Sequence, residues 1–274
     1  ELDDRCLARV AAHSVSGRRQ TNRYLSMTQR RFGNYSQRAR LGLIVPPTNT
    51  VNEAEWMRLL PEGVTLHVTR MPLHADSSSE GGRAALYADI RSHVLSLAQA
   101  APDVIAYGCT AGSMVNPINT LTDYMQQCCG VPAVATAPAL VQAVQALGLR
   151  RVALATPYHD ALNAHEQHFL EDNGIAVLGM RGLGIGAGGA AEYIRIAQVP
   201  LQQVYNHVLA ADVAGADAIL ISCTDFASLP LLSGLEQALG KPVISSNQAT
   251  LWAALRCAGI SDAIPDAGRL LQIA

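Results

Sequence analysis

The sequence predicts an α/β protein built from two similar halves, each with its own parallel sheet. Two observations carry this prediction. Short apolar runs alternate with stretches of helical periodicity from residue 40 onward, and three segments of the first half recur in the second. Hydrophobic residues make up 49% of the 274 residues and charged residues only 15%, which excludes a disordered chain and is typical of one that buries a sizeable core.

Strands and helices are predicted to follow one another along the first half. An apolar run that ends at Pro46 is typical of a buried parallel strand. Apolar residues at steps of three and four, from Leu86 to Leu97, indicate a helix. The predicted strands occupy residues 41–45, 64–68, 104–107 and 131–134, and the predicted helices occupy residues 80–100 and 139–147. Strands separated by helices favour a parallel sheet covered on both faces.

The second half repeats the first at an offset of about 110 residues, well above the period of solenoid repeats. Residues 149–157 are similar to 39–46, residues 215–224 to 101–110, and residues 240–246 to 130–136, always in the same order. We therefore expect two α/β halves related by a pseudo-twofold axis, at residues 40–148 and 149–274, and the final helix can pack back on the first half. Residues 1–39 are rich in arginine without apolar periodicity and are predicted to form a poorly ordered N-terminal arm.

Composition excludes several classes of function. A formal net charge of -2 gives no electrostatic footprint for nucleic acid or an anionic membrane, and no apolar run approaches the roughly 20 residues that span a bilayer. Lys241 is the only lysine and lies in a Gly-Lys-Pro turn, which disfavours pyridoxal-phosphate chemistry. The six cysteines are irregularly spaced without a CxxC pair, which favours a reduced, cytoplasmic setting and gives no indication of a metal site.

Two of the cysteines occupy the same place in each half. Cys109 and Cys223 each follow a predicted strand and precede a threonine, Thr110 or Thr224. Groups beyond the carboxyl ends of such strands line the crevice where ligands bind, so the two thiols are expected to face one pocket from opposite sides. Helix N-termini beside them are expected to stabilise the thiolates. A lone cysteine at such a position would most often serve as a small apolar residue, but the symmetric pair favours a catalytic role for both.

Three motifs make the resemblance to a known family clear. These are Tyr-Gly-Cys-Thr-Ala-Gly-Ser at 107–113, Ser-Cys-Thr-Asp-Phe-Ala-Ser at 222–228, and Ser-Ser-Asn-Gln-Ala-Thr-Leu-Trp-Ala-Ala-Leu-Arg at 245–256. Together they resemble the aspartate/glutamate racemase superfamily, and most closely its maleate cis–trans isomerase and arylmalonate decarboxylase branch. The resemblance implies two flavodoxin-like halves with the active site in the cleft between them, and no metal or organic cofactor.

The resemblance also assigns roles to residues. Cys109 and Cys223 match the two catalytic cysteines of the family; arylmalonate decarboxylases keep only the second, so decarboxylation is disfavoured here. The resemblance implies substrate-binding roles for Asn49, Tyr158 and Asn163. From their place beside the cysteines, the hydroxyls of Thr110 and Thr224 are expected to help hold a substrate carboxylate. Asn49 is equally suited to capping a helix, and Asn163 falls within a predicted helix.

One region departs from the isomerase pattern. Where the isomerases carry a pocket asparagine, this chain has the glycine-rich stretch 182–189 without an amide, which predicts a mobile flap or a wider pocket. Its glycines at 184, 186 and 189 satisfy GxGxxG, but they come late in their unit and lack an acidic residue at the right distance for a dinucleotide site.

The favoured function is cofactor-independent cis–trans isomerisation of a small unsaturated dicarboxylate, of the maleate-to-fumarate type. The Cys109 thiolate would add to the double bond while Cys223 delivers a proton to the neighbouring carbon. Two alternatives stay open: a two-cysteine racemase or epimerase of a small carboxylic or amino acid, and a non-catalytic protein that binds a small carboxylate. The expected partner is a small mono- or dicarboxylate, and apolar helix faces are compatible with a homo-oligomer.

Overall fold

The computed structural model describes residues 33–74 and 79–273, so most of the expected N-terminal arm lies outside the described residues. The first sheet has four parallel strands in the order β2-β1-β3-β4. These are β1 (Ala39–Val45), β2 (Val64–Arg70), β3 (Val104–Tyr107) and β4 (Ala133–Ala135). Strand β3 is buried along its whole length, because helices cover both faces of the sheet.

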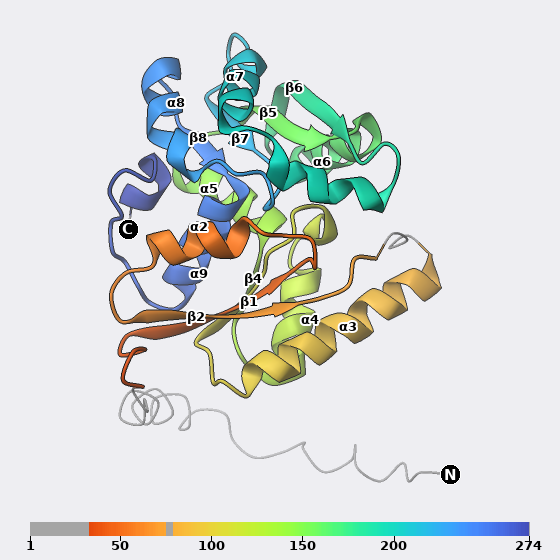
Figure 1. Cartoon of the computed structure of the whole chain (residues 1–274), viewed down its shortest axis with the longest axis vertical. Helices are drawn as coiled ribbons and strands as arrows, with labels where there is room; N and C mark the ends of the chain where they lie inside the picture. The colour runs from red at the N-terminus through yellow and green to blue at the C-terminus, as the bar shows by residue number, and fades with distance from the viewer. Residues whose placement is uncertain (1–32, 75–78, 274) are drawn as a thin grey trace.

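The second sheet has the same topology as the first. Its order is β6-β5-β7-β8 and its strands are again parallel. They are β5 (Arg151–Tyr158), β6 (Ala176–Ile185), β7 (Ala218–Ile221) and β8 (Val243–Ser245). The equivalent order in the two halves confirms the predicted fold of two similar flavodoxin-like α/β units, which Figure 1 shows one above the other.

The helices lie between and outside the sheets. In the first half they are α2 (Asn52–Leu59), α3 (Glu80–Ala98), α4 (Thr120–Cys129) and α5 (Thr136–Ala146). In the second half they are α6 (Asp160–Asp172), α7 (Leu201–Ala211), α8 (Leu232–Leu239) and α9 (Ser246–Cys257). Helix α3 buries the residues whose spacing predicted it, including Leu86 and Leu97. Four short 3₁₀ segments complete the described chain: η1 (Ala111–Ser113), η2 (Ala190–Gln198), η3 (Leu229–Leu231) and η4 (Arg269–Gln272).

The halves exchange one helix each. Helix α5 follows the last strand of the first sheet but places Leu140 in the core of the second sheet, together with Leu154 of β5. Helix α9 follows the last strand of the second sheet but places Leu251 in the core of the first, together with Leu41 of β1. The two helices contact each other and lie between the sheets (Figure 1). Each core is therefore completed by a helix that the other half supplies.

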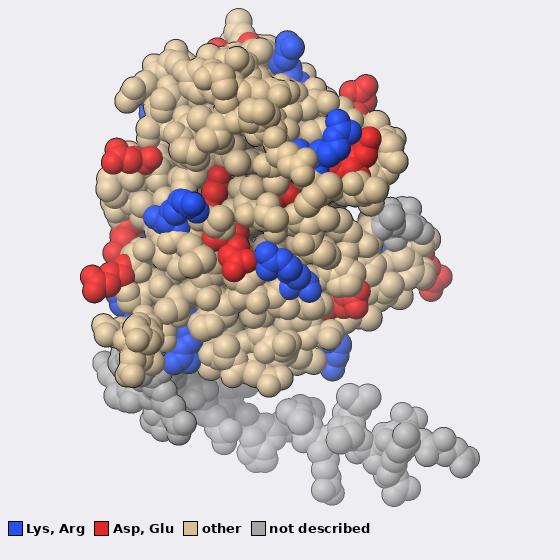
Figure 2. All heavy atoms as spheres, viewed as in Figure 1, with Lys and Arg blue, Asp and Glu red and all other residues tan. Residues whose placement is uncertain are grey.

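The face of the molecule drawn in Figure 2 carries few charges, and they are mixed in sign. Figure 2 shows basic and acidic side chains interspersed over an otherwise uncharged face, without a one-signed patch on that side. Among the residues that the structure describes, no helix combines the length and apolar character needed to cross a membrane.

Candidate active site

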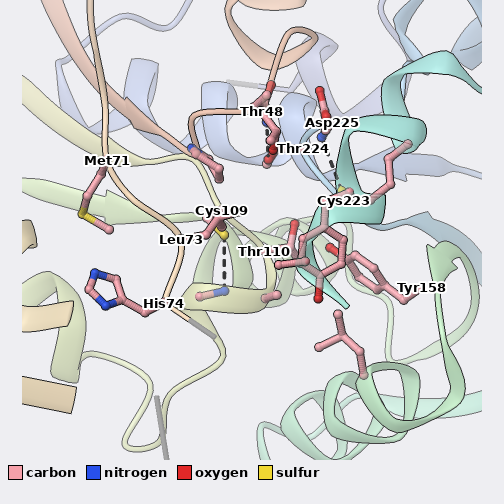
Figure 3. Close-up of a pocket in the computed structure, with 18 of the residues that line it drawn as sticks. Thr48, Met71, Leu73, His74, Cys109, Thr110, Tyr158, Cys223, Thr224 and Asp225 are labelled. Atoms are coloured by element: carbon pink, nitrogen blue, oxygen red, sulfur yellow. Dashed lines mark hydrogen bonds between the residues drawn. The ribbon is translucent and has the colours of Figure 1, made fainter. Parts of the chain in front are cut away.

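A cavity of about 400 Å³ lies between the halves, at the carboxyl ends of the central strands. It brings six of the seven predicted site residues together: Asn49, Cys109, Thr110, Tyr158, Cys223 and Thr224. The two cysteines approach it from opposite halves, as Figure 3 shows. The strand-end position of the repeated Cys-Thr pair is the reason for this convergence, because β3 and β7 are equivalent in the two sheets.

Cys109 is held by groups that follow it along the chain. The side chain is buried, and its Sγ accepts a hydrogen bond of 3.4 Å from the Gly112 backbone N–H. A Cβ at position 112 would lie 2.5 Å from the Tyr107 hydroxyl oxygen and 3.2 Å from the Cys109 Sγ. Only glycine therefore lets this N–H approach the sulfur. The nearby Tyr107 hydroxyl favours the ionised form of this thiol and so acts to lower its pKa.

Cys223 has a different local geometry. Its φ of 84° lies in the left-handed region, which costs a non-glycine residue about 1–3 kcal/mol and is concentrated at functional sites. The Sγ accepts a hydrogen bond of 3.4 Å from the Asp225 N–H (Figure 3). The nearby Tyr158 hydroxyl, on the neighbouring strand β5, favours the ionised form of this thiol and so acts to lower its pKa.

The thiols of both cysteines are harder to ionise than an exposed thiol. Burial raises the pKa of Cys109, against the opposing effect of the Gly112 N–H and the Tyr107 hydroxyl. Burial raises the pKa of Cys223 to about 12, and the Asp225 carboxylate acts in the same direction. The expectation of thiolates stabilised by helix N-termini is therefore wrong in its net direction, because the loss of hydration outweighs the N–H contacts. The neighbouring carboxylate gives Cys223 a further reason to remain a thiol.

Asn49 combines the two roles that its position suggested. Its Oδ1 accepts hydrogen bonds from the N–H groups of Val51 at 3.1 Å and Asn52 at 2.9 Å, which caps helix α2. Its Nδ2 donates to the Thr224 hydroxyl at 2.9 Å. Asn49 lines the cavity, yet its amide is already engaged by protein groups on both sides.

The two threonines connect the halves. Thr224 donates its hydroxyl proton to the Gly108 carbonyl at 3.0 Å, and the Thr110 hydroxyl lies 2.9 Å from that of Ser246. Both side chains line the cavity, but both hydroxyls hydrogen-bond groups of the opposite half. They hold the two cysteine loops in register with each other.

Asn163 lies away from the cavity wall. Its Oδ1 accepts a hydrogen bond of 2.5 Å from the Thr156 hydroxyl, and its Nδ2 donates to the Tyr158 carbonyl at 3.2 Å. It is buried and does not belong to the cavity lining, so a direct contact with substrate does not follow from the structure. The side chain instead fixes the backbone that carries Tyr158. A Cβ at Gly182 would collide with this amide, which accounts for one glycine of the glycine-rich stretch.

The glycine-rich stretch is not one loop. Strand β6 extends to Ile185, so the first part of the stretch is sheet, and the expected flap is shorter than predicted. The following turn is held by Glu192, whose Oε2 accepts the N–H groups of Gly186 at 2.8 Å and Gly188 at 3.2 Å. Segment η2 then brings Tyr193 to the cavity wall.

The cavity wall also contains residues that the sequence analysis did not single out, among them Tyr107, Asp225 and Tyr193. Tyr107 and Asp225 stood inside the two quoted cysteine motifs, and their distance of two residues from a cysteine was the available signal. Tyr193 had no such signal, because a 3₁₀ segment outside any motif carries it. Burial raises the pKa of Asp225 to about 6, against the N–H groups of Thr50 and Val51. In the described part of the chain, no group of three or more His, Cys, Asp or Glu side chains is placed to hold a metal ion.

Comparisons with known proteins place this geometry in a family. The arylmalonate decarboxylase family model matches residues 41–271. The chain is 33% identical to maleate isomerase from Nocardia farcinica, over 85% of this chain and 95% of that protein. It is 31% identical to arylmalonate decarboxylase from Bordetella bronchiseptica, over 85% of this chain and 96% of that protein.

Solved structures agree. A cysteine-to-serine variant of the Nocardia farcinica maleate cis–trans isomerase, with a covalently bound succinylcysteine intermediate, is similar with a TM-score of 0.75 and 31% identity, over 85% of this chain and 98% of that one. Arylmalonate decarboxylase is similar with a TM-score of 0.73 and 29% identity, over 86% of this chain and all (100%) of that one. The chain belongs to the arylmalonate decarboxylase family, in the aspartate/glutamate racemase-like branch that includes the maleate isomerases, and it is an isomerase of that branch.

Proposed function

We propose that the protein isomerises the cis double bond of a small unsaturated carboxylate without a cofactor, with Cys109 as nucleophile and Cys223 as general acid and base. The observation that carries the proposal is the pair of thiols that face one cavity from opposite halves. The two thiols differ in that the Asp225 carboxylate raises the pKa of Cys223 only. The succinylcysteine intermediate of the Nocardia farcinica relative supports a covalent cysteine route.

In the proposed reaction, the Cys109 thiolate forms a C–S bond with one alkene carbon. The Cys223 thiol transfers its proton to the other alkene carbon, which gives a saturated thioether with a freely rotating single bond. After rotation, the Cys223 thiolate removes the proton from that carbon and the C–S bond breaks. The trans alkene leaves, and both cysteines return to their starting forms.

The difference between the two sulfurs supports this assignment of roles. A general acid must hold its proton until the carbon accepts it, and the Asp225 carboxylate favours the protonated form of Cys223. A backbone N–H and a tyrosine hydroxyl favour the ionised form at both sulfurs, so the Asp225 carboxylate is the group that distinguishes them. Of the two cysteines, Cys109 is therefore better suited to attack.

The cavity wall suits a small, weakly held anion. No Lys or Arg is found among the described residues that line it, so hydrogen-bond donors would have to hold a substrate carboxylate. Apolar side chains such as Met71, Leu73 and Leu86 form one flank. A cavity of about 400 Å³ is larger than a four-carbon acid needs, so maleate fits and a somewhat larger substrate would fit as well.

The test is to incubate the reduced protein with maleate, or with its monoamide maleamate, and to follow the trans product by proton NMR in heavy water. We expect trans product from wild type, none from Cys109→Ser, and unchanged turnover from Cys257→Ser, whose cysteine is exposed and away from the cavity. No isomerisation of either compound would contradict the proposal. Deuterium entering an sp³ carbon of aspartate instead would favour the racemase alternative.

A further inference from the structure

A carboxylate of the protein itself lies at the cavity wall beside Cys223. Asp225 follows Cys223 by two residues, is 6% exposed, and belongs to the cavity lining. Figure 3 shows it on the side of the cavity that carries Cys223, whose sulfur accepts the Asp225 N–H. A cavity expected to receive a dicarboxylate therefore already contains one negative charge.

Asp225 also takes the anion-binding position of the facing helix. Its Oδ1 accepts a hydrogen bond of 2.8 Å from the Thr50 N–H, at the entry to helix α2. The next two N–H groups, of Val51 and Asn52, bind the Oδ1 of Asn49. Free N–H groups at a helix start are a common site for a ligand carboxylate. Here oxygen atoms of the protein occupy them, so a substrate carboxylate finds no such site at this end.

The second oxygen of Asp225 is left without a partner. Its Oδ2 is buried and has no hydrogen-bond partner among the described residues. A buried carboxylate oxygen without a hydrogen-bond partner is unfavourable, so the described protein groups leave this charge partly uncompensated. Arg70, which donates to the Asn49 carbonyl, is itself paired with Glu53.

The two ends of the cavity differ in this respect. Ala111 stands at the same offset from Cys109 as Asp225 does from Cys223, and it is uncharged. The pseudo-twofold axis would give a symmetric dicarboxylate two similar ends to bind. One end with a carboxylate on the cavity wall and one end without are suited instead to a substrate with two different ends.

We infer that the preferred substrate is a cis-unsaturated monocarboxylate whose group nearest Cys223 is a neutral hydrogen-bond donor, such as a carboxamide. Asp225 is the specificity-determining residue that rejects a second carboxylate there. This inference rests on the proposed isomerase function and narrows its substrate class.

The test compares kcat/KM for maleamate and maleate in wild type, Asp225→Asn and Asp123→Asn. Wild type should prefer maleamate by at least about tenfold, because like charges in a partly dehydrated site repel strongly. Asp225→Asn keeps an oxygen for the Thr50 N–H and removes the charge, so the preference should fall by at least about tenfold, mainly through a lower KM for maleate. Asp123 is exposed on α4, and its variant should behave as wild type.

Binding of the saturated analogues succinate and succinamate to wild-type protein provides a measurement that needs neither turnover nor a variant. We expect succinamate to bind more tightly. Tighter binding of succinate, or a wild-type preference for maleate that Asp225→Asn leaves unchanged, would overturn the inference and leave the isomerase function standing. If wild type isomerises neither compound while still binding succinamate more tightly, it is the proposed function that fails.

Discussion

The Asn49 amide of the first half donates a 2.9 Å hydrogen bond to the Thr224 hydroxyl of the second half. Thr224 in turn donates to the Gly108 carbonyl, directly before Cys109. This chain of hydrogen bonds ties the loop that carries one cysteine to the loop that carries the other. The separation of the two thiols is thereby set by side chains distant in sequence.

Substitutions of Asn49 should separate capping from positioning. Asn49→Ala removes both, and we expect the free energy of unfolding to fall by about 1–2 kcal/mol along with kcat/KM. Asn49→Ser keeps an oxygen for the α2 N–H groups but cannot span to Thr224. It should regain most of the stability in urea denaturation and little of the activity. Equal activity in the serine variant and wild type would show that the bridge is dispensable.

Gly112→Ala should impair activity by displacing the groups around Cys109. The new Cβ would lie 2.5 Å from the Tyr107 hydroxyl oxygen, so the phenol or the N–H contact has to move. We expect a fall in kcat/KM of about tenfold or more and a loss of about 1–3 kcal/mol in stability. Gly81→Ala is the matched control, because nothing lies within 4 Å of its Cβ and helix α3 favours alanine. That variant should be as active as wild type and slightly more stable.

The value of kcat/KM should rise with pH. Burial raises the pKa of Cys109, so only a small fraction is thiolate at neutral pH. Between about pH 7.5 and 9.5, kcat/KM should increase by up to about tenfold per pH unit, until the thiol is mostly ionised. Cys223, with its pKa raised to about 12, stays protonated across this range and gives no falling limb. A bell-shaped profile with a maximum below pH 8 would contradict the proposed roles.

Glu166 should make stability depend on pH. It accepts a hydrogen bond from Ser222, and burial raises its pKa to about 7, above the roughly 4.3 of an unfolded chain. The folded state therefore keeps a proton that the unfolded state has released, and this stabilisation is lost as the pH rises through about 7. Between about pH 5 and 8, the difference in unfolding free energy between wild type and Glu166→Gln should fall by about 2–3 kcal/mol.

The measurement is urea denaturation of both proteins at each pH, with circular dichroism as the signal. Because other groups titrate equally in the two proteins, their contributions cancel in the difference. A difference that stays constant across the range would mean that Glu166 does not change its protonation on unfolding.

Patterns that depend on the local chain could be predicted from the sequence. The uninterrupted apolar run 104–107 predicted β3 to the residue, and the repeated Cys-Thr pair predicted that Cys109 and Cys223 share a cavity. Both predictions follow from the burial of strands and from the topology of parallel sheets, which is the same in the two halves.

Features that depend on tertiary contacts could not be predicted. Asn163 looked like a pocket residue, but its amide turns to the Tyr158 carbonyl, and only the packing of α6 against β5 determines that. Asp225 lies within a quoted cysteine motif, but its place on the cavity wall depends on a hydrogen bond from the Thr50 N–H, 175 residues away in the chain. The raised pKa values of the two thiols likewise depend on how the folded chain buries them.

The exchange of α5 and α9 bears on the order in which the protein can be made. The ribosome releases every strand of the first sheet long before it releases α9, whose Leu251 and Leu255 cover the core of that sheet. Until then one face of the nascent sheet is uncovered, and we expect it to remain sensitive to protease and to need shielding from aggregation. A fragment that ends before α9 should share this fate. The last α-helix to be synthesised is thus the one that completes the core around the first strands.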